Sequence, residues 1–209
     1  MRQASGFGVV VAACLLLLAP GAVASNSTLY LDPSGDPPTT APDLASVQVS
    51  NDDAGTVVFR LSIPNRVTLA ESDLVAVLVD ADGKSGTGCA RGTFGAEYAL
   101  DVLANRYVFG RCRRGQWDFT RPPASFAGTF GHSTLTLQVN RRDLGGTSAF
   151  RFRIGSAATS GAEPDYDFAP EVGAAPWSYQ IIAPPGAAKQ PPRHRGRALR
   201  ARRHPSLPH

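Results

Sequence analysis

Short runs of alternating apolar and polar residues, separated by turn-forming residues, constrain the fold of this chain more than any other feature. Residues 56–63 read Thr-Val-Val-Phe-Arg-Leu-Ser-Ile and follow a turn cluster at residues 51–55, which is the pattern of a β-hairpin. Residues 74–79 are almost continuously apolar, and this predicts a central strand buried on both faces. The alternating pattern recurs at residues 96–102, 135–139 and 150–154.

About ten such segments, with almost no helix, predict an all-β domain. Only residues 141–144 suggest a helical turn. Many short strands at regular spacing are typical of a β-sandwich or a β-barrel. Residues 25–43 are rich in Pro, Ser, Thr and Asp and are predicted to be an irregular lead-in. We therefore place the β domain at residues 44–183.

The first 24 residues have the three parts of a secretory signal peptide. Arg2 gives a positively charged start, residues 9–19 are apolar, and residues 22–24 are small enough for a cleavage site. The apolar run is shorter than the roughly 20 residues that a membrane-spanning helix needs, and no later segment is apolar enough to cross a bilayer. We expect cleavage after Ala24 and a secreted, extracellular protein, either free or associated with the cell envelope.

Two cysteines, Cys89 and Cys112, remain after removal of the signal peptide. Export would expose them to an oxidising environment, in which paired cysteines form disulfides. A turn at residues 104–105 brings the strand that ends at Cys112 back toward the same end of the sheet as Cys89. We predict a disulfide between them, and two free buried thiols are the alternative.

Charge is divided between the predicted domain and the end of the chain. Residues 26–182 carry 13 Lys/Arg and 17 Asp/Glu, whereas residues 183–209 carry seven Lys/Arg and no Asp or Glu. The basic pI therefore does not imply a nucleic-acid surface on the domain, and no sequence-specific nucleic acid is expected as a partner. Residues 184–209 are predicted to be disordered, and they either hold the protein near a cell-envelope polyanion or form a nonspecific solvated tail.

Several short motifs stand out along the chain, namely Asp32-Pro33-Ser34-Gly35-Asp36, residues 41–44, residues 47–52, residues 78–83 with Thr87-Gly88, residues 95–100, Gly115-Gln116-Trp117 and Asp167-Phe168-Ala169-Pro170. Together they resemble motifs of secreted β-sandwich domains related to family 9 carbohydrate-binding modules and to DOMON domains. The likeness extends over residues 29–182. The resemblance implies a β-sandwich of jelly-roll type, and it implies carbohydrate or haem as ligand classes.

The turn that begins with Asp80 and Asp82 resembles the start of an oxygen-rich calcium loop. Against calcium, Lys84 stands where such a loop needs Asp or Asn, and no glutamate follows at its twelfth position. A turn capped by the two aspartates is the alternative reading. Two further acidic pairs are predicted to lie on loops, namely Asp32 with Asp36 and Asp165 with Asp167.

The sequence argues against haem, zinc and several hydrolase mechanisms. No methionine remains after the signal peptide, and His132 is the single histidine before residue 184, so neither His/Met nor two-histidine haem ligation is available. One histidine and two bridged cysteines do not complete a zinc site. His132 is instead predicted to be a solvated turn residue. Glu97 and Asp101 would lie roughly 13 Å apart on one strand, which is too far for glycoside hydrolysis, although other carboxylate pairs remain open.

Aromatic residues beside polar ones indicate a carbohydrate site, because a sugar has an apolar face and a rim of hydroxyl groups. The candidate ligand-binding residues are Trp117, Tyr107, Arg111 and Glu97, with Trp177, Tyr166 and Tyr179 as further aromatic candidates. Core packing of both tryptophans is the alternative.

These features predict a secreted, non-catalytic module that binds carbohydrate or a related polar ligand. A structural or protein-interaction domain of the cell surface, without a small-molecule ligand, is the second hypothesis. A glycoside hydrolase is the third.

Overall fold

The computed structural model describes residues 26–32, 40–89, 94–103, 106–159 and 164–182. The predicted signal peptide (1–24) and the predicted basic tail (184–209) lie outside the described residues, so both stay predictions. Within the described ranges, no helix has the length and apolar character needed to span a membrane.

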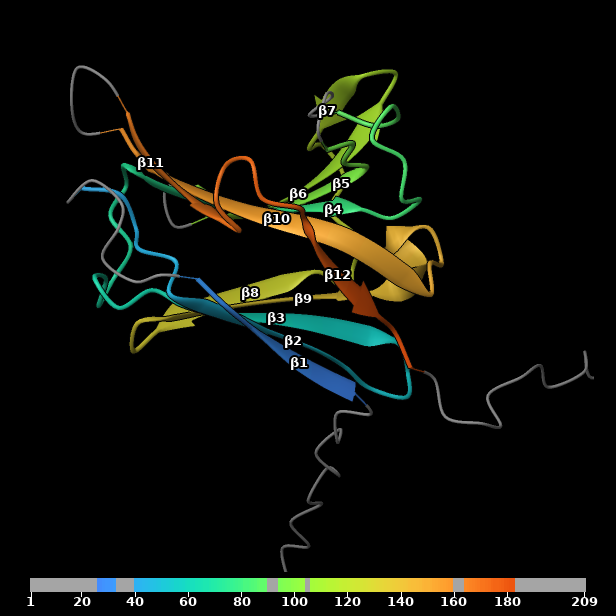
Figure 1. Cartoon of the computed structure of the whole chain (residues 1–209), viewed down its shortest axis with the longest axis horizontal. Helices are drawn as coiled ribbons and strands as arrows, with labels where there is room; N and C mark the ends of the chain where they lie inside the picture. Colours follow the sequence, from blue (N-terminus) through green and yellow to red (C-terminus); the bar gives the residue numbers. More distant parts are fainter. Residues whose placement is uncertain (1–25, 33–39, 90–93, 104–105, 160–163, 183–209) are drawn as a thin grey trace, which may run out of the picture.

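The chain forms a β-sandwich of two antiparallel sheets (Figure 1), which confirms the predicted all-β fold. The first sheet has five strands in the spatial order β1 (Asn26–Leu31), β2 (Ser46–Asn51), β3 (Thr56–Ser62), β9 (Thr134–Asn140) and β8 (Ala127–Gly131). The second has seven strands in the order β11 (Asp165–Ala169), β10 (Ala149–Ala158), β4 (Asp73–Asp80), β5 (Tyr98–Leu103), β6 (Arg106–Arg113) and β7 (Gln116–Asp118), with β12 (Trp177–Gln180) also paired to β10.

The chain passes repeatedly from one sheet to the other. It crosses from the five-stranded to the seven-stranded sheet between β3 and β4, returns between β7 and β8, and crosses again between β9 and β10. Because β3 pairs with β9 and β4 pairs with β10, the first and the last crossing are adjacent, as in a jelly roll. The predicted helical turn is present as η1 (Arg141–Leu144), where the Asn140 side chain accepts a hydrogen bond from the Arg142 N–H and Gly145 ends the turn with φ of 76°.

The alternating pattern determines which side chains fill the space between the sheets. In β3, Val57, Phe59 and Leu61 are buried, whereas the residues between them reach the surface. The Phe59 ring lies between the sheets, with centroid distances of 5.7 Å to Phe150 and 5.6 Å to Phe152. Burial of such side chains is the main favourable contribution to folding, at about 25 cal/mol per Å² of apolar surface.

The prediction that β4 is buried on both faces was wrong. One row of its side chains is fully buried between the sheets, namely Val75, Val77 and Val79. The other row faces away from the five-stranded sheet and is only half-buried, namely Leu74, Ala76 and Leu78. The continuous apolar run therefore combines a core-facing row with a row on an apolar outer surface.

The segment predicted to be an irregular lead-in contains β1, which pairs with β2 along its whole length. Its pattern conceals a strand because Leu29 and Leu31 are exposed. Tyr30 is the side chain that holds β1 on the core, with its ring 5.1 Å from that of Phe152 and 5.2 Å from that of Trp177. The tertiary contacts of Tyr30 thus stabilise β1 as a strand, although the local composition does not indicate one.

The predicted disulfide between Cys89 and Cys112 is confirmed, with 5.5 Å between the Cα atoms. It joins the loop that precedes β5 to β6. Cys89 also forms a backbone bridge with Ala96, so the far end of this loop is fixed at two points. His132 lies, as predicted, in an exposed turn, where it adopts a left-handed φ of 50°.

Candidate functional site

The four predicted ligand-binding residues do not converge on one site. Tyr107 packs against the core between the sheets. Arg111 lies on the same side of β6, with its guanidinium carbon 5.6 Å from the centre of the Phe109 ring and a nitrogen 3.5 Å from Asp143 Oδ1. Trp117 belongs to the opposite side, because it pairs with Cys112 in the β6–β7 ladder.

Glu97 lies on the side of the sheet that carries Trp117. The N–H of Cys112 donates a hydrogen bond to the carbonyl of Glu97 at 2.7 Å, which places Glu97, Cys112 and Trp117 in one row. Core packing is the correct interpretation for Trp177, which contacts Tyr30 and Phe152. Trp117 is half-buried beside Phe119, with ring centroids 6.2 Å apart, and does not belong to the core cluster.

The outer faces of the two sheets differ in chemistry. The ladder registers show that the five-stranded sheet presents mainly hydroxyl and amide side chains, including Ser46, Gln48, Ser62, Thr134, Thr136 and Gln138. The seven-stranded sheet presents mainly small and apolar residues, including Leu74, Ala76, Leu78, Val108, Gly155 and Ala157. We call the latter surface the apolar face, and an apolar surface of this kind is typical of a binding site.

A trough of about 230 Å³ lies on the apolar face between β4, β10 and β11. Tyr166 and Phe168 form its wall, with their rings stacked at a centroid distance of 6.1 Å and an interplanar angle of 15°. They remain 51% and 38% exposed. Their partners across the ladder are Ala157 and Gly155, and a Cβ at Gly155 would come within 3.3 Å of the Phe168 ring. Small residues opposite large rings therefore create the trough.

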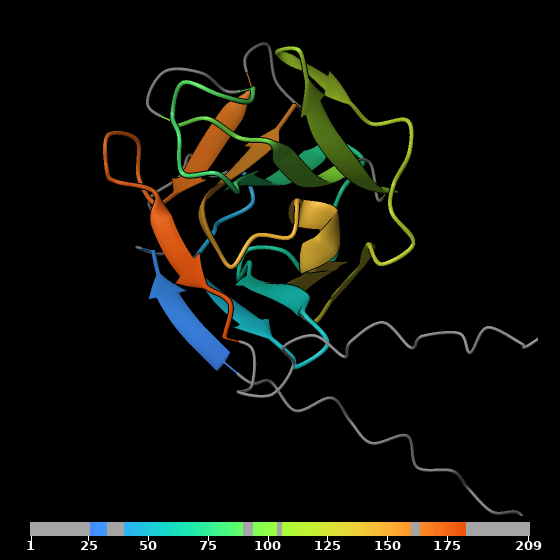
Figure 2. The same ribbon diagram turned by 90° about the vertical axis from the view of Figure 1, so that its right-hand side faces the viewer.

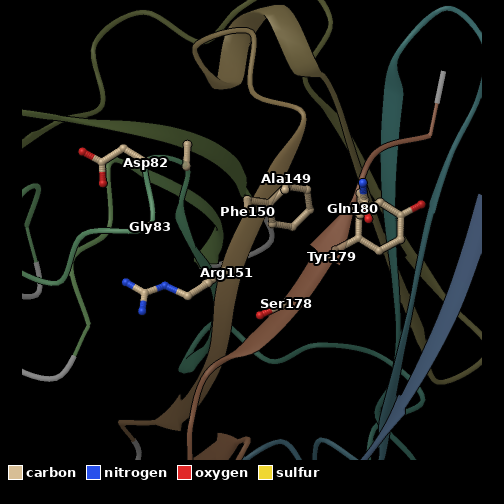
Figure 3. A pocket seen from close by; sticks show the side chains of 9 residues that line it. Asp82, Gly83, Ala149, Phe150, Arg151, Ser178, Tyr179 and Gln180 are labelled. Atoms are coloured by element: carbon tan, nitrogen blue, oxygen red, sulfur yellow. The ribbon is translucent and has the colours of Figure 1, made fainter.

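A second hollow, of about 540 Å³, lies where β10 meets β12 and the turn after β4. Arg151 and Ser178 face each other across the β10–β12 ladder. In Figure 3, Asp82 and Arg151 extend to one side of these strands, whereas the rings of Phe150 and Tyr179 extend to the other. Where this hollow opens on the outer surface of the seven-stranded sheet, polar side chains line it, namely Asp82, Arg151, Ser178 and Gln180. We call this hollow the polar hollow.

The predicted calcium turn is a hydrogen-bonded turn capped by its aspartates. The N–H groups of Gly83 and Lys84 donate to Asp80 Oδ1 and Asp82 Oδ1 at 2.7 and 2.9 Å. Asp80 is fully buried and forms an ion pair with Arg151, whose Nε lies 2.8 Å from Asp80 Oδ2. The alternative prediction from the sequence, a turn capped by the two aspartates, is therefore confirmed.

Glu97 joins the two aspartates in an acidic cluster whose carboxylate oxygens lie within 4.8 Å of one another. Its Oε2 accepts a hydrogen bond from the Ala81 N–H at 2.9 Å, and the Thr87 hydroxyl lies 3.1 Å from its Oε1. Burial raises the pKa of Glu97, the two hydrogen bonds oppose the rise, and the charges of Asp82 and Asp80 add to it. Oxygen-rich clusters of this kind suit a hard cation such as Ca²⁺.

Asp101 is a carboxyl group on the apolar face that sequence reasoning did not identify as a site residue. In the ladders it lies between Ala76 on β4 and Val108 on β6. Its Oδ1 is buried and accepts no hydrogen bond from any residue that the structure describes. Burial raises the pKa of Asp101 to about 7, so its protonation changes near neutral pH.

A second set of acids lies at the opposite end of the seven-stranded sheet. The carboxylate oxygens of Asp32, Asp167 and Glu171 lie within 4.8 Å of one another, and Asp167 accepts a hydrogen bond from the Leu44 N–H at 2.7 Å. The prediction that Asp165 and Asp167 lie on a loop was wrong, because both belong to β11.

Comparisons of the chain with protein-family models, with curated proteins and with solved structures find no match. The resemblance to family 9 carbohydrate-binding modules and DOMON domains therefore stays a prediction, and the apolar face has to be interpreted from its own geometry. Sequence reasoning missed the pairing of Phe168 with Tyr166, although a signal was present: two aromatic residues two positions apart in an alternating segment lie on one face of a strand.

Proposed function

We propose that this protein is a secreted, non-catalytic binding module and that it binds carbohydrate on the apolar face. The stacked and exposed rings of Tyr166 and Phe168 beside the trough support this proposal most strongly. The C–H face of a sugar packs on such rings, while its hydroxyl groups need polar partners nearby. Arg153 borders the trough and Arg151 borders the polar hollow, so both kinds of contact are present.

Large aromatic side chains on a strand make an effective binding surface because they are rigid. Tyr166 and Phe168 have two side-chain torsions each, and their strand is fixed to β10 over five residue pairs. Little conformational entropy is therefore lost when a ligand packs against them.

Binding to insoluble and soluble polysaccharides tests the proposal, by pull-down and by isothermal titration calorimetry. We expect the double substitution Tyr166→Ala with Phe168→Ala to weaken binding by about tenfold or more, since each buried aromatic contact contributes about 1 kcal/mol or more. The double substitution Leu29→Ala with Leu31→Ala is the matched control, because it removes two exposed apolar side chains from the five-stranded sheet. Unchanged affinity in the aromatic variant would contradict the proposal.

The same measurements separate the two other hypotheses. A protein that binds no polysaccharide but associates with itself or with other proteins through Tyr166 and Phe168 would indicate a structural or interaction domain. Release of reducing sugar, lost in the single substitution Glu97→Gln, would indicate a glycoside hydrolase. One carboxylate oxygen of Asp82 lies within 4.8 Å of one of Glu97, and retaining enzymes hold their two carboxyl groups roughly 5 Å apart.

We also propose that the acidic cluster of Asp80, Asp82 and Glu97 binds calcium in a structural role. Arg151 forms an ion pair with Asp80, one of the three carboxylates, and added Ca²⁺ would further reduce the repulsion among them. Millimolar CaCl₂ should then raise the thermal midpoint, by mass action on the folded state. The variant Asp82→Asn should lose this increase, while Asp118→Asn, which changes a half-buried acid on β7, should retain it. An equal response of both variants would contradict calcium binding here.

A further inference from the structure

Two hollows lie on the same side of β10, one on each side of Arg153. The odd-numbered residues of this strand face outward, so Arg151, Arg153, Gly155 and Ala157 form one row. Arg151 lines the polar hollow, and Gly155 and Ala157 line the trough. Arg153 stands between them.

The two hollows suit different parts of one kind of molecule. The trough offers aromatic rings and small apolar residues, which match the C–H face of a sugar ring. The polar hollow offers a guanidinium, a carboxylate, a hydroxyl and an amide, from Arg151, Asp82, Ser178 and Gln180. These groups match the hydroxyl rim of a sugar, because they include both donors and acceptors.

Arg153 is held in place at the junction of the two hollows. Its guanidinium donates hydrogen bonds to the carbonyl oxygens of Pro170, Glu171 and Ala174 in the loop that joins β11 to β12. Figure 2 shows that loop projecting from the edge of the molecule next to β12. The surface between the hollows is thus formed before any ligand binds, which lowers the cost of binding.

The length of this surface indicates whether the ligand is a single sugar or a polysaccharide chain. Arg151 and Ala157 are six residues apart in a strand, which corresponds to roughly 20 Å. One pyranose ring is several times shorter than this. We infer that the site extends along β10 from the trough, past Arg153, into the polar hollow, and that its ligand is the interior of a polysaccharide chain. This inference rests on the proposed function.

Titration calorimetry with cello-oligosaccharides and chito-oligosaccharides, each from the monosaccharide to the hexasaccharide, tests the inference. We expect affinity to rise by about tenfold or more along at least one series before it levels off, as further sugar residues reach the second hollow. The double substitution Ser178→Ala with Gln180→Ala should lower hexasaccharide affinity by about tenfold and leave the affinity for the shortest binding ligand unchanged.

The five-stranded sheet supplies a matched control, the double substitution Ser27→Ala with Gln48→Ala, which removes the same two side-chain types from an outer surface. It should leave every affinity unchanged, and equal thermal midpoints will show that both variants fold. Equal affinity for monosaccharide and hexasaccharide would overturn the inference but leave the proposed function intact. An unchanged hexasaccharide affinity in the Ser178/Gln180 variant would also overturn it. Absence of binding to every member of both series and to the parent polysaccharides would overturn both.

Discussion

Asp101 places an acidic group in the apolar face of the seven-stranded sheet, between Ala76 and Val108. Its pKa of about 7 in the folded protein lies above the value of 3.8 for an unperturbed aspartate. The folded state therefore binds the proton more tightly than the unfolded state does. The stabilising effect of this proton is complete below about pH 4 and is lost as the pH rises through about 7.

Replacing Asp101 with valine should stabilise the protein at about pH 8, because the ionised carboxylate is then no longer buried. The difference between the two pKa values corresponds to at most about 4 kcal/mol, and we expect a gain of about 1–3 kcal/mol after losses from imperfect packing. Urea unfolding between pH 4 and pH 8 measures this gain. The variant and the original protein should converge in stability toward pH 4.

Asp118→Asn is a control in which stability should depend on pH in the opposite direction. Hydrogen bonds from Thr120 lower the pKa of the Asp118 carboxyl, with a smaller contribution from the charges of Arg113 and Arg121. Its stabilising effect is present above the unfolded pKa and disappears as the pH falls through the folded pKa. The loss of stability at low pH should therefore be smaller in Asp118→Asn than in the original protein. No effect of Asp101→Val on stability at pH 8 would contradict the account of Asp101.

The choice of candidate ligand residues illustrates what sequence reasoning can resolve at this scale. Tyr107 and Arg111 are four residues apart in β6 and therefore lie on one side of the strand. Both rows of this strand are partly apolar, since Val108 and Gly110 alternate with Tyr107 and Phe109. The sequence therefore could not show which row faces the core, and that depends on the position of the other sheet.

At the scale of secondary-structure elements, strands with a simple pattern were predicted and strands with a mixed pattern were not. β3 and β9 have strictly alternating buried rows, and the sequence located both. β1 exposes two leucines, and β11 buries Asp167 while exposing Phe168. In β11, the hydrogen bond from the Leu44 N–H offsets the cost of burying the Asp167 carboxylate. In β1, the contacts of Tyr30 with the core aromatic rings offset the cost of exposing two leucines.

The disulfide between Cys89 and Cys112 stabilises the element that carries Glu97. It closes a loop with a sequence separation of 23, and the chain-entropy model assigns about 3 kcal/mol to a loop of this size. Replacing both cysteines with alanine should lower the free energy of unfolding by about that amount in urea titrations. A reducing agent should have the same effect on the original protein and no effect on the variant; a stable reduced protein would contradict this expectation.

At the scale of the whole molecule, the alternating pattern was sufficient to predict a sandwich but not to predict which outer surface carries the trough. Each strand has one row of buried side chains and one row of outer side chains. The sequence shows the composition of each row, but it does not show which strands lie next to one another. The trough forms only because β11 and β4 lie on opposite sides of β10. Such neighbours are far apart in sequence, so the composition of each strand alone does not reveal the site.

The predicted basic tail gives a further expectation at this scale. Among the described residues, the core cluster ends at Ile181, and residues 183–209 contribute seven positive charges. Removing residues 186–209 should leave the thermal midpoint nearly unchanged and should release the protein from the cell envelope, as high salt should do for the full chain. A truncated protein that unfolds, or one that stays on the envelope under both treatments, would contradict this.

The strands at the two ends of the described sandwich lie side by side (Figure 1). Asn26 donates a hydrogen bond to the carbonyl of Gln180 at 2.8 Å, and Asn51 donates one to the carbonyl of Ile182 at 2.9 Å. A force that pulls these ends apart would load the four residue pairs between β12 and β10 one after another, beginning with Gln180 and Ala149. Under tension the molecule should therefore open as a zipper at low force, and the polar hollow should be disrupted while the aromatic wall on β11 is still in place.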